Sequence, residues 1–113
     1  MENNYKLYRV RELADNDEDF VKSLAEAFLE EVPEDAQILK KAVATKDYES
    51  AYQAAHKMKP TIDLFELGVL QDLIVVQDWG KFKKTEEDCS DELQLVMNAV
   101  ENASQELKED FDL

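Results

Sequence analysis

Hydrophobic residues recur along this chain with the three- and four-residue spacing of amphipathic helices, and no stretch shows the sustained alternation of a strand. The fold class that this pattern predicts is all-α. Four main helices are expected, with a further segment and a short N-terminal helix: roughly residues 17–32, 47–63, 66–79 and 90–109, then 34–45, then a piece within 8–14. Residues 1–7 are expected to form a flexible N-terminal arm, and residues 8–113 a single helical domain.

Capping residues, prolines and glycines set the expected boundaries of these helices. Residues 15–17 form an N-cap cluster, and Asp47 is placed to cap the helix that follows it. Pro33 is expected to stop the first long helix, because the residue before a proline is pushed out of helical geometry. Gly80 is placed to end the most apolar helix. The short linker before Asp47 predicts that the helices on its two sides pack antiparallel.

The composition restricts the classes of partner and the cellular compartment. The chain has 27 acidic and 13 basic side chains, which give a formal net charge of −14. Such a surface is repelled by nucleic acids and by anionic membranes, so neither is expected as a partner. Cys89 is the only cysteine, so it cannot form an internal disulfide, and no signal-like segment opens the sequence. These features predict a reduced, cytoplasmic protein.

The candidate chemistry lies on the predicted helix over residues 47–63, which carries the only histidine of the chain, His56. At about 100° per residue, His56 falls roughly 110° from the centre of the apolar stripe of this helix. Its ring is therefore expected at the edge of the buried face, within reach of a partner. Lys57 is adjacent and Lys59 lies one turn on, and an imidazole beside two ammonium groups is suited to holding a phosphoryl group.

Pro60 follows this group of residues within the same predicted helix. A proline inside a helix removes one backbone hydrogen bond and crowds the carbonyl four residues before it, which belongs to His56. The helix is therefore expected either to end near Met58 or to kink beside the histidine. Both alternatives disturb the backbone at His56.

The segment Ala55-His56-Lys57-Met58-Lys59 resembles the signature of histidine-containing phosphotransfer (HPt) domains, which is Ala-His-x-Leu-Lys followed by a small residue. The similarity extends over most of residues 7–110. Residues 10–20, 28–33 and 46–48 resemble the opening segment of the family, the end of its next helix and the turn before its histidine helix. Two glycines of the family pattern, at the fourth and tenth positions after the histidine, are Pro60 and Glu66 here.

This resemblance implies an antiparallel four-helix bundle with an additional short N-terminal helix. It implies that His56 accepts a phosphoryl group from the phospho-aspartate of a receiver domain and passes it to another receiver. The chain would then be a carrier without autonomous kinase activity, and not an enzyme. Lys59, Lys57, Gln53 and Pro60 are the expected phosphoryl-stabilising or docking residues.

The same resemblance implies the partners of the chain. They are the receiver domain of a response regulator or of a hybrid sensor kinase. A divalent metal is expected only on that receiver, so no cofactor and no metal site are expected on this chain, which we expect to be a monomer.

Less specific interpretations of the same residues remain open. His56 fits an unreactive, solvated histidine, and Lys57 and Lys59 fit ordinary exposed lysines whose stems cover apolar surface. A second functional class is a helical interaction module that binds a receiver or another signalling protein without carrying phosphate. The changed positions Pro60 and Glu66 favour this alternative.

Overall fold

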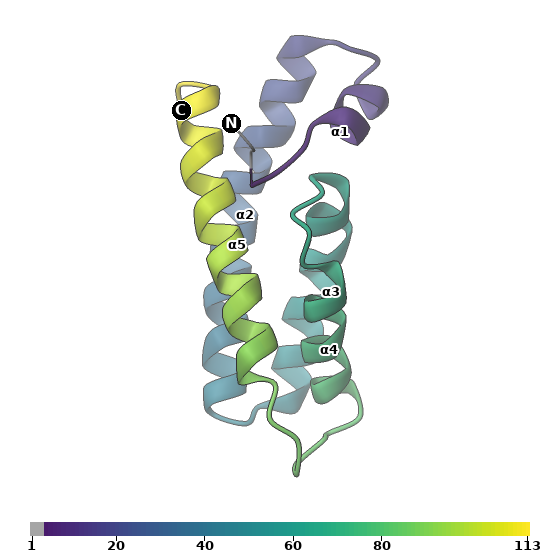
Figure 1. The fold of residues 1–113 in the computed structure, drawn as a ribbon, viewed down its shortest axis with the longest axis vertical. Helices are drawn as coiled ribbons and strands as arrows, with labels where there is room; N and C mark the ends of the chain where they lie inside the picture. The colour runs from purple at the N-terminus through teal and green to yellow at the C-terminus, as the bar shows by residue number, and fades with distance from the viewer. Residues whose placement is uncertain (1–3) are drawn as a thin grey trace.

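Five helices make up a computed structural model of the chain, which describes residues 4–113. The helices are α1 (Tyr8–Leu13), α2 (Glu18–Ala44), α3 (Tyr48–Leu64), α4 (Leu70–Lys81) and α5 (Ser90–Asp110). No strand occurs within the described residues, so the predicted all-α class is confirmed for them. The four longer helices lie side by side along the long axis of the molecule, and α1 lies at one end (Figure 1).

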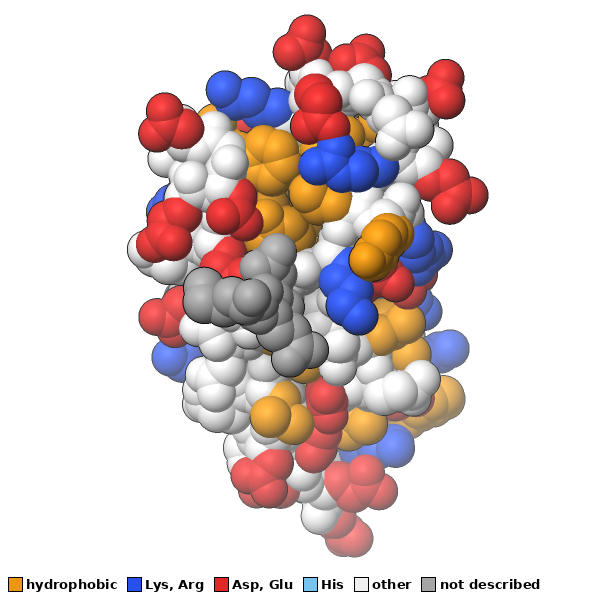
Figure 2. Space-filling model, turned by 45° about the horizontal axis from the view of Figure 1, so that its top comes forward, with side chains coloured by type: hydrophobic (Ala, Val, Ile, Leu, Met, Phe, Trp, Pro, Cys, Tyr) orange, Lys and Arg blue, Asp and Glu red, His pale blue; other side chains and the backbone are white. Residues whose placement is uncertain are grey.

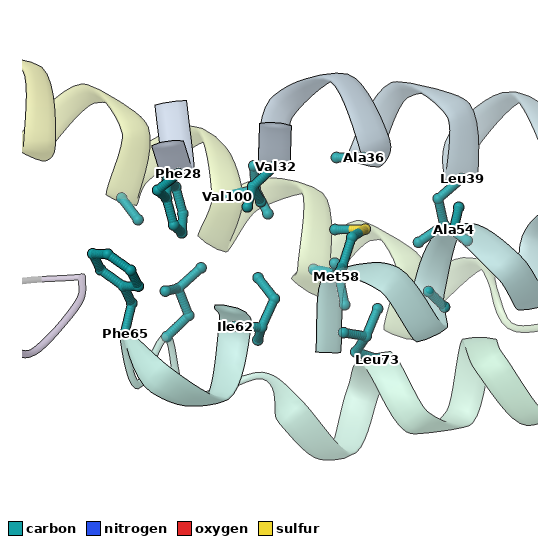
Figure 3. Packing of buried hydrophobic residues seen from close by; sticks show 14 of the residues in the cluster. Phe28, Val32, Ala36, Leu39, Ala54, Met58, Ile62, Phe65, Leu73 and Val100 are labelled. Carbon is teal, nitrogen blue, oxygen red and sulfur yellow. The ribbon is translucent and has the colours of Figure 1, made fainter. Parts of the chain in front are cut away.

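Each of the four long helices packs against two of the others. α2 packs against both α3 and α5, and α4 packs against the same two helices. Their apolar stripes meet in one core (Figure 3). Phe28 of α2 and Phe65, which follows α3, place their ring centroids 5.0 Å apart in a tilted arrangement. This core fixes which side of α3 is buried and which side is left on the surface.

α2 is one continuous helix, so the prediction that Pro33 stops it was wrong. Pro33 lies inside α2 and is partly buried. The apolar stripe continues across it, because Val32 is 2% exposed before it and Ala36 is 1% exposed after it. A proline in a helix interior costs roughly 3 kcal/mol, and the burial of a few large apolar side chains at about 1.5–3 kcal/mol each offsets that cost.

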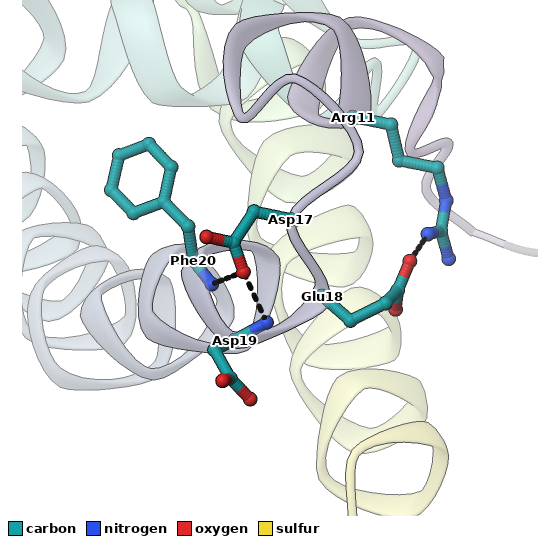
Figure 4. Close-up of polar contacts among 5 residues, drawn as sticks. All are labelled: Arg11, Asp17, Glu18, Asp19 and Phe20. Carbon is teal, nitrogen blue, oxygen red and sulfur yellow. Dashed lines mark hydrogen bonds and ion pairs between the residues drawn. The ribbon is translucent and has the colours of Figure 1, made fainter.

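The N-cap expected within residues 15–17 is confirmed. The Asp17 carboxylate accepts hydrogen bonds from the backbone N–H groups of Asp19 at 3.0 Å and Phe20 at 3.4 Å (Figure 4). Arg11 of α1 forms an ion pair with Glu18 at the same helix start. These contacts join α1 to the first turn of α2.

The connection between α3 and α4 is longer than the sequence pattern predicts. The expected helix start at residue 66 is wrong, because α4 begins at Leu70. Glu66 has a φ of 50° and Gly68 a φ of 81°, and two residues in the left-handed region interrupt helical geometry. The predicted role of Gly80 as a helix end is also wrong, since α4 runs on to Lys81.

Residues 4–7 lie against the body of the molecule, whereas residues 1–3 of the expected flexible arm lie outside the described part. Tyr5 is 2% exposed, and its hydroxyl donates a hydrogen bond to Asp110 at the end of α5. The backbone N–H of Lys6 donates to the carbonyl of Phe65 at 2.8 Å. This segment therefore links the ends of α3 and α5.

The surface reflects the acidic composition. Acidic side chains are spread over the face that Figure 2 presents, with fewer basic ones between them. Among the helices of residues 4–113, none combines the length and the apolarity needed to cross a membrane.

Candidate functional site

α3 carries the candidate site, and its first turn is fixed by Asp47. The Asp47 carboxylate accepts hydrogen bonds from the backbone N–H of Ser50 at 3.2 Å and from its hydroxyl at 2.8 Å. These two bonds lower the pKa of Asp47 below its ordinary value. The predicted cap is thus present at the start of α3.

The opposite sides of α3 differ sharply. Ala55, Met58 and Ile62 are at most 1% exposed and face the core. His56 is exposed, as the helical spacing predicts. The histidine therefore lies on the open side of a helix whose other side is fixed by packing.

The ring of His56 has an aromatic neighbour. Tyr52, four residues earlier and partly buried, stacks on the imidazole with ring centroids 5.7 Å apart and an angle of 25° between the planes. Long side chains of a helix lean toward its N-terminus, so a residue at position i covers the turn of residue i−4. This geometry brings the imidazole of His56 back over Tyr52.

The two expected lysines differ in their surroundings. Lys57 Nζ donates a hydrogen bond to Asp35 Oδ1 on α2 at 3.2 Å, and the Asp35 side chain is only 9% exposed. Lys59 is partly buried and forms no ion pair within residues 4–113. At three residues beyond His56, Lys59 also leans toward the turn of the histidine. Lys57 is therefore engaged with α2, whereas Lys59, three residues beyond His56, forms no ion pair in this range.

Gln53 and Pro60 lie on the exposed side of α3. The Gln53 amide donates a hydrogen bond to Glu49 at 2.8 Å, so its amide nitrogen is already engaged along the helix. α3 continues through Pro60 to Leu64, and the alternative that it ends near Met58 is therefore wrong. Because proline has no N–H, the carbonyl of His56 lacks its ordinary helical donor.

The position of α4 relative to α3 depends on Gly80. A Cβ atom at Gly80 would lie 2.6 Å from the backbone oxygen of Tyr48 and 2.8 Å from the backbone nitrogen of Tyr52. These atoms belong to the main chain of α3, so they cannot move aside cheaply. Next to this contact, the rings of Tyr48 and Trp79 lie 4.6 Å apart. α4 thus lies directly against the turns of α3 that precede His56.

Two residues beside the site were missed by reasoning from the sequence. Tyr52 fits the apolar stripe, and its place four residues before His56 is the signal that could have identified it as a neighbour of the ring. Asp35 carries no such signal, because its contact with Lys57 joins two helices that are 22 residues apart in sequence. The Asp63 carboxylate forms an ion pair with Arg9 at 2.9 Å, and this contact connects α1 to the end of α3.

The site is a surface and not an enclosed pocket. A groove of about 430 Å³ lies between α2 and α5, whereas His56 lies on the exposed side of α3. Among residues 4–113, no three His, Cys, Asp or Glu side chains gather in a way that could hold a metal ion. An exposed imidazole on a convex helix surface is accessible to the surface of another macromolecule.

Comparison with known proteins adds no relative: no protein-family model, no curated protein and no solved structure matches the chain.

Proposed function

We propose that this chain is a cytoplasmic phosphorelay intermediate of the HPt type, in which α2–α5 form an antiparallel four-helix bundle and α1 is the additional short helix. His56 accepts a phosphoryl group from the phospho-aspartate of a receiver domain and passes it to another receiver. The observation that carries this proposal is the single imidazole, exposed on α3 with Lys59 three residues beyond it. The partner is the receiver domain of a response regulator or of a hybrid sensor kinase.

The transfer needs one nucleophilic nitrogen and no base on this chain. A neutral imidazole has one unprotonated ring nitrogen, whose lone pair attacks the phosphorus. The N–P bond forms as the P–O bond to the aspartate of the receiver breaks, and the aspartate carboxylate leaves with the electron pair. Delivery to a second receiver is the reverse of this step. A single exposed histidine is sufficient for such a shuttle.

Charge stabilisation is the task of the groups around the ring. Phosphoryl transfer passes through a loose transition state with charge on three equatorial oxygens, so positioning and neutralisation dominate the catalysis. We assign the neutralising role on this chain to Lys59, since Lys57 is held by the buried carboxylate of Asp35. The divalent ion and the acidic residues belong to the receiver.

A phosphotransfer assay tests the proposal. A receiver domain charged with acetyl phosphate is mixed with the wild-type chain and with the His56→Gln, Lys59→Ala and Lys57→Ala variants. We expect the phosphoryl group on the wild type and none on His56→Gln. The rate should fall about tenfold in Lys59→Ala, which loses one charged hydrogen bond to the phosphoryl oxygens, and stay near the wild-type value in Lys57→Ala. Strong labelling of the His56→Gln variant would refute the assignment of the acceptor.

A second candidate function is a helical interaction module that binds a receiver without carrying phosphate. Pro60 favours it, because this exposed ring stands one turn beyond His56 where the family pattern has a glycine. A bulkier residue there restricts how closely a phosphorylated partner approaches the imidazole. Receiver binding that survives His56→Ala, with no phosphohistidine formed from any charged receiver, would favour this second function.

A further inference from the structure

An exposed histidine has to be ordered before it can react in line with a phosphoryl group. Its side chain rotates about two bonds, and an ordered nucleophile reacts faster because the loss of conformational freedom has already occurred. On the open side of α3, few neighbours are available to restrict the imidazole of His56. The ring of Tyr52, which stacks on the imidazole, is one such neighbour.

Tyr52 lies in a closely packed turn of α3. It is partly buried, and the backbone of α4 at Gly80 lies so close that a Cβ there would be 2.8 Å from the Tyr52 nitrogen. One turn earlier, Tyr48 packs its ring on Trp79 of α4, with the centroids 4.6 Å apart. The α3–α4 contact thus holds the backbone turn that carries Tyr52, and the Tyr52 ring presents an aromatic face to His56.

We propose that Tyr52 is a positioning residue for His56, which rests on the proposed function of that histidine. The phenol ring stacks on one face of the imidazole at 5.7 Å and 25° and restricts its plane. A ring held by its face keeps its edge free, and both nitrogens are on the edge. Because an aromatic pair adds a modest attraction beyond the area that it buries, the loss of the stack lowers the transfer rate about threefold to tenfold.

The ring of Tyr52, and not its hydroxyl, performs this role. Tyr52→Phe keeps the aromatic face and is expected to transfer phosphoryl within about twofold of the wild-type rate. Tyr52→Leu keeps an apolar side chain at this partly buried position, so the variant folds, but it has no aromatic face to stack. Tyr8→Ala is the matched control, because Tyr8 is a 78% exposed tyrosine on α1.

A ¹H NMR measurement reports the stack directly. His56 is the only histidine, so its two ring C–H signals are the only imidazole signals of the chain. We expect ring-current shifts of these signals in the wild type, the Tyr52→Phe variant and the Tyr8→Ala control. In Tyr52→Leu we expect the signals at the positions of a free histidine.

The transfer assay completes the test, with the rate at saturating receiver separated from the receiver concentration at half saturation. We expect Tyr52→Leu to lower the saturated rate and to leave the half-saturating concentration unchanged. Imidazole signals that are identical in wild type and Tyr52→Leu, or equal transfer rates of these two proteins, would overturn the positioning role alone. A Tyr52→Phe variant as slow as Tyr52→Leu would overturn it as well. A wild-type chain that takes no phosphoryl group would overturn the proposed function and this role together.

Discussion

Asp35 of α2 and Lys57 of α3 form a cross-helix ion pair, in which the ammonium donates to a carboxylate oxygen at 3.2 Å. Only 9% of the Asp35 side chain is exposed, against 64% of Lys57. The carboxylate is the buried member, so it depends on the lysine more than the lysine depends on it. Lys57 is therefore part of the contact between α2 and α3, although it is the residue next to His56.

Lys57→Ala tests this assignment. It leaves a buried carboxylate without its cation, and we expect the free energy of unfolding to fall by about 1–3 kcal/mol. Lys59→Ala removes a lysine that forms no ion pair in the described part of the chain, and should change stability by less than about 0.5 kcal/mol. Urea unfolding of both variants is the measurement. The transfer assay should rank them in the opposite order, and equal stability losses would contradict the assignment.

Gly80→Ala tests the close approach of α4 to α3. The added methyl group would meet backbone atoms of Tyr48 and Tyr52 at 2.6 and 2.8 Å, so the helices have to move apart. We expect a loss of about 2 kcal/mol or more, measured as a lower urea midpoint. Gly68→Ala is the control, since a Cβ there meets no atom within 4 Å and the strain comes only from a φ of 81°. A loss in Gly80→Ala no larger than in this control would contradict the steric role.

Glu66→Gly should stabilise the fold. Glu66 adopts a φ of 50°, which glycine tolerates at lower cost, and its Oε2 atom is buried without a hydrogen-bond partner. We expect a gain of about 1 kcal/mol in the free energy of unfolding. Lys46→Gly provides the comparison, because Lys46 has a φ of 57° but is an exposed residue. The gain should be smaller there, and a destabilised Glu66→Gly protein would show that this strain has been misjudged.

Tyr5 should make the fold sensitive to alkaline pH. Burial, and then the hydrogen bond to Asp110 and its charge, raise the pKa of Tyr5 well above its ordinary value of 10.0. Above about pH 10 the unfolded chain loses the phenolic proton while the folded chain keeps it, so stability present below that pH is lost as the pH rises. Urea midpoints at about pH 9 and about pH 11 measure this loss.

Tyr5→Phe isolates that contribution. The variant should lose less stability between these two pH values than the wild type, because it has no proton to release. Tyr8→Phe, at a 78% exposed position, should keep the wild-type pH dependence. An unchanged dependence in Tyr5→Phe would mean that other groups are responsible.

Local signals in the sequence predicted much of the fold. Asp17 and Asp47 cap α2 and α3 as expected, because an N-cap depends on neighbours within three residues. The continuity of α2 through Pro33 escapes the local rule that proline breaks a helix, because the apolar stripe outweighs that rule. That stripe runs from Phe28 through Val32 to Ala36 and Leu39, and tertiary packing over it keeps α2 continuous.

Only part of the candidate site could be predicted from the sequence. The exposure of His56 follows from helical spacing alone. The selection between Lys57 and Lys59 does not, because it depends on Asp35, which another helix brings close. The role of Gly80 cannot be predicted from the sequence either, because its contact with α3 exists only when the two helices pack together.

The most direct measurement is phosphorus NMR of the chain after it has been mixed with a charged receiver domain. We expect one new resonance with the character of a phosphorus–nitrogen bond, stable in base, lost in acid and coupled to the only imidazole ring of the protein. The same spectrum of the His56→Gln variant should lack it. Absence of that resonance from the wild type under every charged receiver, or its persistence in the variant, would contradict the account.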